Sequence, residues 1–269
     1  MKYLNVGLLL VVLASQFARA QSADTSPSAK KKGTIYFTWG YHRDAYTKST
    51  IRFQDHTTDN YDFTFHNAKA RDQPDWNNFF HTPLTVPQFS ATLGYILDNE
   101  KGFGIELSSD HLKYVIIDNQ VMHVSGNIRG TNIDKDTLVT PAFVHYEHTN
   151  GNNYWMVNIV KKTKLIGSRN GHHVLNSLVK GGAGILLPKT ESVIMGGFND
   201  GPYKVAGWVV GASVNLRYDV FKYFFLEASA KGCFADFVAA KLLNDGKASQ
   251  HFFSVQYIWS AGINYPIGR

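Results

Sequence analysis

The chain has 269 residues, of which 14% are aromatic and 18% charged, below the roughly 25% charged residues of an average soluble domain. Its single cysteine, Cys233, excludes a disulfide framework and a cysteine-based metal site. The formal net charge is +6, but Lys2 and Arg19 lie in the predicted leader and Lys30, Lys31 and Lys32 lie beside the predicted domain, so nucleic-acid binding is not indicated.

The first twenty residues predict an export signal. Lys2 precedes a short apolar run at 6–14, and an Ala-x-Ala cleavage motif ends at Ala20. The apolar run is about half of the roughly 20 residues that a membrane-spanning helix needs. We therefore expect a signal peptide at 1–20, cleaved near Ala20 after export through the inner membrane, and a flexible segment at 21–32.

From residue 33 onward the chain alternates apolar and polar side chains with a period of two, which indicates β-strands. The clearest run is 251–265, where apolar and aromatic side chains share one face and only Ile258 interrupts the polar, small face. At about 15 residues it exceeds the usual five or six of a globular strand. Shorter segments of the same design lie at 34–41, 88–95, 103–108, 205–218 and 224–234.

Long strands with one apolar face, and with aromatic residues near their ends, predict a membrane barrel rather than the alternative, a secreted β-sandwich. In lipid every backbone group must be paired within the protein, which for strands leaves only a closed barrel. We therefore expect an all-β fold over 33–269. We expect it to be a closed antiparallel transmembrane β-barrel of the bacterial outer membrane, with long extracellular loops and short periplasmic turns.

Turn signals set the expected topology. Tight turns at 98–101 and 218–222 are assigned to the periplasm, so 44–85 becomes a long extracellular excursion that contains strand-like pieces at 50–53 and 61–65. The count is ten strands if 175–197 folds as a hairpin at Pro188, and eight if two weaker segments lie outside the wall. We favour ten.

Several stretches resemble a group of uncharacterised Bacteroidota-type outer-membrane β-barrel proteins. The resembling stretches are WGYHRDAYTKSTIRF at 39–53, DHLKYV at 110–115, EHTNGNNY at 147–154, GAGILLPKT at 182–190 and VFKYFFLEASAKG at 220–232. The likeness covers most of the predicted mature chain. It implies the barrel fold and brings no established activity with it.

Charged residues on the polar face of the strands point into the predicted lumen. A barrel of eight or ten strands is narrow and largely filled by side chains, so opposite charges inside it are expected to pair. We expect a structural network that plugs the lumen; a narrow path for small solutes is the alternative. The candidate lumen charges are Glu106, Asp110, His145, Lys180, Arg217, Glu227 and Lys231.

A weaker likeness points to the barrel lipid A deacylases, which carry a His-x-Ser-Asn stretch and a separate Glu. Thr149-Asn150 is similar to the Ser-Asn part, but Glu147 occupies the position of the His, and His148 is displaced by one residue. A one-residue shift turns a side chain to the other face of a strand. Under this alternative the catalytic residues would be His148, Glu147 and Asn150.

We therefore expect a structural or surface-binding barrel without enzymatic activity, with a lipid A acyl hydrolase and a narrow pore as alternatives. We expect no cofactor and no metal site. The expected partners are outer-membrane lipids, lipopolysaccharide and the barrel-assembly machinery during insertion, with no nucleic acid.

Overall fold

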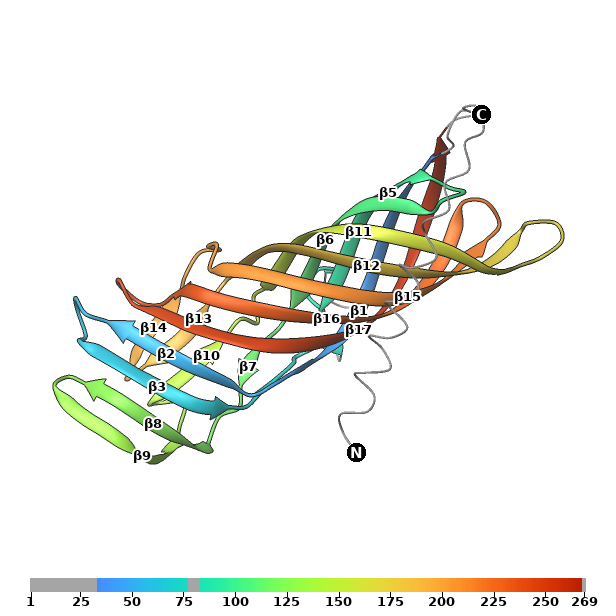
Figure 1. The fold of residues 1–269 in the computed structure, drawn as a ribbon. Coiled ribbons are helices and arrows are strands. Elements are labelled where there is room, and N and C mark those ends of the chain that lie inside the picture. Colours follow the sequence, from blue (N-terminus) through green and yellow to red (C-terminus); the bar gives the residue numbers. More distant parts are fainter. Residues whose placement is uncertain (1–32, 77–82, 268–269) are drawn as a thin grey trace.

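The computed structural model describes residues 33–76 and 83–267. The predicted signal peptide at 1–20 and the segment 21–32 lie outside these residues. Strands make up most of the described chain (Figure 1). Within the described ranges, no helix has the length and apolar character needed to cross a membrane.

The centre of the fold is a closed ring of antiparallel strands, eight of them in the described part of the chain. Their order around the ring is β1, β5, β6, β11, β12, β15, β16 and β17, and β17 pairs again with β1. This last pairing runs from Gly33 opposite Ile267 to Tyr46 opposite Ser254. The ring strands are β1 (Gly33–Tyr46), β5 (Phe89–Asp98), β6 (Phe103–Leu112), β11 (Asn152–Gly167), β12 (His173–Pro188), β15 (Gly207–Val220), β16 (Phe224–Lys241) and β17 (Lys247–Ile267).

The preference for ten strands is not confirmed. The segment 175–197 does not fold as a hairpin of the wall, because β12 pairs with β11 on one side and β15 on the other, and β13 beyond Pro188 pairs with β10 and β14 instead of with β12. Pro188 ends that strand; proline has no backbone N–H to donate to a ladder. The chain beyond it leaves the ring for a second sheet.

The two ends of the ring differ (Figure 1). Short turns join β5 to β6, β11 to β12 and β15 to β16 at the end where β1 begins and β17 finishes. We call this the turn end. The opposite end carries long excursions that fold into further strands, which we call the head: β2 (Ser49–Asp55), β3 (Tyr61–Ala68), β4 (Ala70–Arg71), β7 (Val115–Ile116), β8 (Gln120–Ile128), β9 (Thr131–Val139), β10 (Val144–Glu147), β13 (Glu191–Ile194) and β14 (Gly197–Asp200).

The head continues the barrel wall rather than forming loose loops. The first residues of β17 leave β1 and pair with β2, and the sheet then continues through β3, β8 and β9. β2 and β3 fall where the strand-like pieces at 50–53 and 61–65 are expected. A second sheet, in the order β14, β13, β10, β7 and β4, completes the head.

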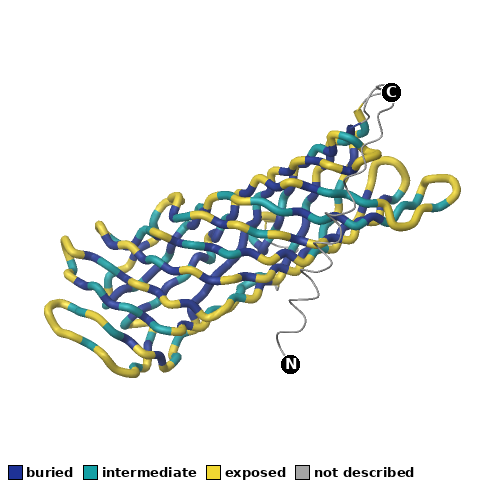
Figure 2. The backbone as a smooth tube through the Cα atoms, in the orientation of Figure 1, coloured by how far each residue is buried: buried dark blue, intermediate teal, exposed yellow. Residues whose placement is uncertain are grey.

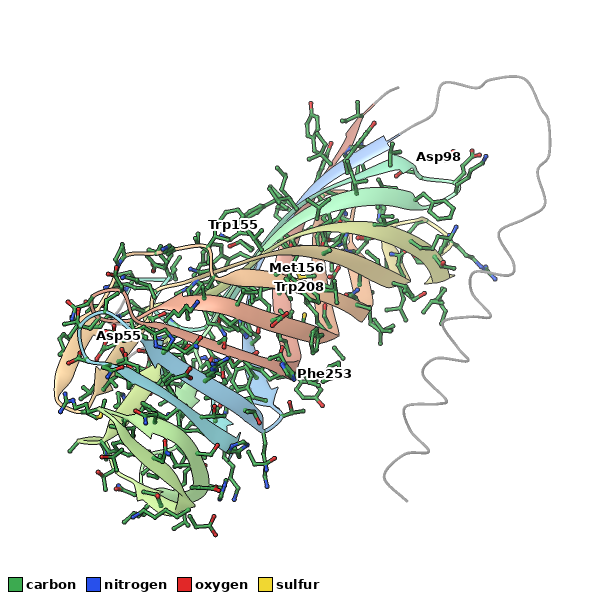
Figure 3. All side chains as sticks on the ribbon, turned by 60° about the vertical axis from the view of Figure 1, so that its left-hand side comes forward. Asp55, Asp98, Trp155, Met156, Trp208 and Phe253 are labelled. Atoms are coloured by element: carbon green, nitrogen blue, oxygen red, sulfur yellow. The ribbon has the colours of Figure 1, made fainter. Side chains whose placement is uncertain are left out.

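The outer surface of the ring is apolar, and buried and exposed positions alternate along each strand (Figure 2). Trp155, Trp208 and Phe253 are exposed toward the head, far from Asp98 at the turn end (Figure 3). On β15, Trp208 and Tyr218 are ten residues apart, which at roughly 3.3 Å per residue and a tilt of about 40° is about 25 Å. That is the height of the apolar band of an outer-membrane barrel.

The interior divides into two parts. Toward the head, one continuous hydrophobic core fills the space between the sheets and reaches into the ring. Its aromatic side chains stack closely; the rings of Tyr114 and Phe252, for example, lie 4.9 Å apart and nearly parallel. Toward the turn end the interior is instead polar and charged.

Candidate functional site

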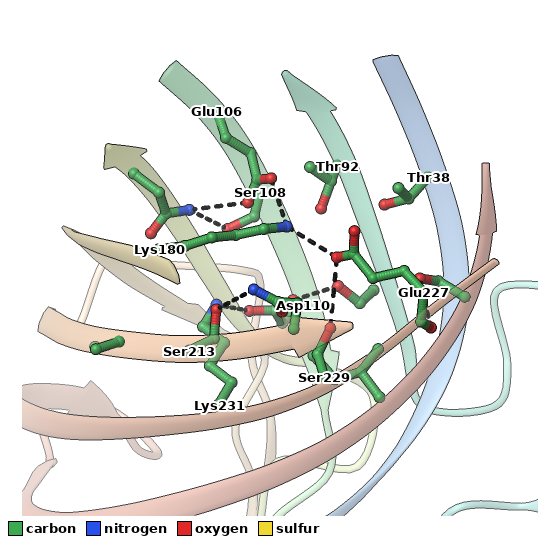
Figure 4. Close-up of a pocket in the computed structure, with 17 residues that line it drawn as sticks. Thr38, Thr92, Glu106, Ser108, Asp110, Lys180, Ser213, Glu227, Ser229 and Lys231 are labelled. Atoms are coloured by element: carbon green, nitrogen blue, oxygen red, sulfur yellow. Dashed lines mark hydrogen bonds and ion pairs between the residues drawn. The ribbon is translucent and has the colours of Figure 1, made fainter. Parts of the chain in front are cut away.

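The polar interior is organised around a chain of buried ion pairs (Figure 4). The Nζ atom of Lys180 on β12 lies 2.7 Å from Glu106 on β6 and 3.0 Å from Glu227 on β16. The second carboxylate oxygen of Glu227 accepts from Nε of Arg217 on β15 at 2.6 Å. None of the four side chains is more than 9% exposed. Four ring strands are thus tied together through the lumen.

A second ion pair lies beside this chain. Lys231 Nζ is 2.5 Å from Asp110, whose other carboxylate oxygen accepts from the Ser90 hydroxyl at 2.6 Å. The amide of Asn158 donates to the Ser108 hydroxyl at 3.1 Å. The carboxylates are therefore bonded by neutral donors as well as by cations, whereas one guanidinium nitrogen of Arg217, Nη2, is buried without a hydrogen-bond partner among the described residues.

The six charged residues carry three negative and three positive charges and leave little free space. The cavity that five of them line, all except Arg217, measures about 30 Å³, enough for one or two water molecules. The structure brings together these predicted lumen residues: Glu106, Asp110, Lys180, Arg217, Glu227 and Lys231.

An aromatic clamp closes the lumen on the turn side of these pairs. The Arg217 guanidinium lies between two rings, 4.3 Å from the centroid of Tyr36 and 3.9 Å from that of Phe225. The Tyr36 hydroxyl donates to Glu106 at 2.7 Å, which joins the clamp to the ion pairs. Tyr36 fits because Gly94, directly opposite on β5, has no Cβ to meet its ring.

The clamp residues are absent from the sequence-based set of site residues. Both rings occupy positions of the polar face whose neighbours in sequence point outward: Tyr36 lies between Ile35 and Phe37, and Phe225 between Phe224 and Leu226. An aromatic residue at an inward-facing position of the alternating pattern is the sequence signal that would have identified the clamp residues.

The position of His145 corrects the prediction that it belongs to the lumen charges. It lies on β10 in the second sheet of the head, with 21% of its side chain exposed. Its Nδ1 is 2.9 Å from Asp118, and its Nε2 is 3.3 Å from Glu147. Burial alone lowers the pKa of His145, but the hydrogen bond to Asp118 and the charges of both carboxylates outweigh it and raise the pKa above its ordinary value.

The raised pKa predicts that this cluster stabilises the head more at low pH. The stabilisation is fully present below the ordinary histidine pKa of about 6.5 and is lost as the pH rises through the raised value. We expect His145→Gln to lower the free energy of unfolding by about 0.5–1 kcal/mol near pH ~5.5 and to change it little near pH ~9. Urea unfolding at both pH values measures this, and an equal loss at both would contradict it.

The candidate catalytic residues of the hydrolase alternative do not converge. His148 follows β10, is 0% exposed and stacks on Phe237 at 5.4 Å between ring centroids. Burial among aromatic rings lowers the pKa of His148 to about 3, so its imidazole is neutral at physiological pH. A group in this position does not reach a lipid substrate at the surface.

The other two members of that set lie apart from this histidine. Glu147 ends β10 with its side chain on the opposite face, where it accepts from the Thr149 hydroxyl at 2.5 Å. The amide of Asn150 donates weakly to Glu191, at 3.4 Å. The Thr149 hydroxyl is thus hydrogen-bonded to a carboxylate rather than to an imidazole, unlike the nucleophile and base of a serine-hydrolase site.

Solved outer-membrane proteins are similar to this chain in structure. They include OprG from Pseudomonas aeruginosa (TM-score 0.38, 10% identity, covering 90% of this chain and 99% of OprG) and AlkL, determined in lipid bilayers (TM-score 0.38, 11% identity, covering 93% and 97%). Ail, the attachment invasion locus protein of Yersinia pestis, follows with a TM-score of 0.34 and 11% identity, covering 88% of this chain and 100% of Ail. No protein-family model and no curated protein matches the chain.

Proposed function

We propose that the protein is a β-barrel of the bacterial outer membrane with a sealed lumen, and that it acts without catalysis, as a structural or surface-binding protein. The single observation that carries this proposal is the buried ion-pair cluster, whose cavity of about 30 Å³ leaves no room for a solute. The expected partners follow from the location: outer-membrane lipids and lipopolysaccharide around the wall, and the assembly machinery during insertion.

The outer surface of the ring supports the membrane location. Large apolar side chains there are exposed to an extent that water would penalise, for example Ile159 at 68% and Tyr265 at 68%. Closure of the ring pairs its strands on both edges, which is what a lipid environment demands of strands. With the short turns in the periplasm, the head lies outside the cell, where a folded surface suits contact with other molecules.

The lumen offers little support for a pore. A solute entering from the turn end meets the rings of Tyr36 and Phe225, then the ion pairs, and then the aromatic core around Phe252. Passage would require the separation of buried charges, and breaking such a pair costs about 3–5 kcal/mol. This interior therefore favours a sealed lumen over a pore.

Single-channel recording tests the sealed lumen. We expect the full-length mature protein, inserted into planar bilayers, to give no stepwise conductance, while a general porin inserted in the same way does. Heat-modifiable gel mobility and protease protection in liposomes verify that the barrel is folded and inserted. Discrete conductance steps from the inserted protein would refute the proposal.

A non-catalytic role is supported by the scattered catalytic candidates. The imidazole of His148 is buried in the core of the head, and the carboxylate of Glu147 faces away from it.

A further inference from the structure

The turn end of the barrel carries an excess of positive charge. Beyond the lumen ion pairs, this end has six basic side chains, Lys101, Lys161, Lys162, Lys164, Arg169 and Lys222, against three acidic ones, Asp98, Glu100 and Asp219. The head and the rim beneath it carry slightly more acidic than basic residues. The charge is therefore separated along the barrel axis.

Five of these lysines surround a cup of about 430 Å³ in the mouth of the barrel. The cup is lined from opposite sides of the ring: Thr34 of β1 and Asn264 of β17 lie on one side, and Asn176 of β12 lies on the other. Asp219, which lines the cup, lies opposite Phe225 in the register of β15 and β16, so the aromatic clamp on Arg217 adjoins the inner end of the cup. A ligand that enters from this end is held there and not passed on.

Two carboxylates line the cup with the five lysines, those of Glu100 and Asp219, and the carboxylate of Asp219 already has its partners. Asp219 accepts from Lys162 at 3.0 Å, from the amide of Asn176 at 2.7 Å and from the amide of Asn264 at 3.1 Å. An anionic oxygen in the cup is thus hydrogen-bonded by an ammonium group and by side-chain amides. Because Asp219 is saturated, it does not neutralise the other lysines.

Three ammonium groups at the mouth have no carboxylate partner among the described residues: those of Lys101, Lys164 and Lys222. Lys161 donates to the backbone carbonyl of Lys101 at 2.5 Å, so it too adds uncompensated charge. Like charges gathered in one concavity repel one another and raise the local concentration of anions. A multiply charged oxyanion would relieve this repulsion.

We propose that this cup binds a phosphate group, carried either by free phosphate or by the headgroup of an anionic phospholipid of the inner leaflet. A phosphate has several acceptor oxygens and up to two negative charges, which suits several separate lysine ammonium groups acting as point charges. The cup is large enough for one such group and its water. The inference concerns only the mouth; its lipid source rests on the proposed placement of the turn end in the periplasm, whereas binding of free phosphate does not.

Calorimetric titration of the full mature protein in maltoside micelles, which contain no phosphate, tests the proposal. One arm titrates inorganic phosphate and the other short-chain phosphatidylglycerol. We expect saturable binding in at least one arm, weakened at least tenfold by Lys164→Ala combined with Lys222→Ala. Binding of inorganic phosphate identifies a free anion as sufficient; binding in the lipid arm alone identifies the headgroup.

A matched variant separates the cup from general electrostatics. Lys135→Ala combined with Lys247→Ala removes the same charge from exposed positions of the head end, and should change the affinity less than twofold. Saturable binding that only the cup variant weakens supports the proposal. No saturable binding in either arm, or equal weakening by both double variants, would overturn it.

Discussion

Glu227→Gln is expected to destabilise the folded barrel by about 3–5 kcal/mol, the usual effect of removing one partner of a buried ion pair. Glu227 accepts from Lys180 and from Arg217 at the same time, and its side chain is 3% exposed. Its neutralisation leaves Arg217 buried without a carboxylate at ion-pair distance, and Lys180 with only Glu106. Equilibrium urea unfolding in micelles or vesicles measures the change.

Two further variants identify the cause. Glu100→Gln makes the same chemical change at an exposed turn and should alter the free energy of unfolding by no more than about 0.5 kcal/mol. Arg217→Met combined with Glu227→Gln restores the charge balance, and we expect it to be more stable than Glu227→Gln alone. If the single variant at 227 is as stable as wild type, the lumen is hydrated enough to solvate a free cation, and it is not sealed.

Val214→Arg is expected to destabilise the protein in a bilayer by about 2–4 kcal/mol. Val214 faces outward on β15, between Trp208 and Tyr218, and so lies near the middle of the apolar band. An arginine there must place its charge in hydrocarbon, where the cost is greatest at the midplane. Reversible unfolding from phospholipid vesicles measures the change.

Val121→Arg is the matched control, because Val121 is an exposed valine of the head. Val121 is 68% exposed and Val214 is 39% exposed. This difference in burial by protein atoms accounts for only a small difference in the effect of arginine at the two sites. In water an arginine at such a position changes stability by about 0.5 kcal/mol at most. Equal effects of the two substitutions would show that the outer face of the ring meets water and not lipid.

The long excursions of the head form paired strands around a hydrophobic core. Its strands extend the wall from β17 through β2 and β3, and its interior is a hydrophobic core with aromatic stacking such as that of Tyr114 on Phe252. The surface that this barrel presents is therefore built on paired strands. Rigid strands hold side chains in fixed positions, which favours specific binding over the loose contact of a flexible loop.

The alternation of residues by itself determined the wall and its two faces. A period of two is a local property, so the apolar phase of 251–265 and of 205–218 predicts which side chains face outward in β17 and β15. The same phase selects Glu106, Lys180, Arg217 and Glu227 as inward-facing. The sequence could identify these lumen charges because the face to which a side chain points depends only on its position within its own strand.

Strand pairing and the contacts between distant residues were decided only by the tertiary structure. Pairing and register are non-local, so the sequence did not indicate that the chain leaves the ring after Pro188, that the ring closes at eight strands within the described residues, or that His145 belongs to the head. The clamp of Tyr36 and Phe225 on Arg217 joins residues far apart in the chain. Such contacts depend on ring closure, which no short window of sequence specifies.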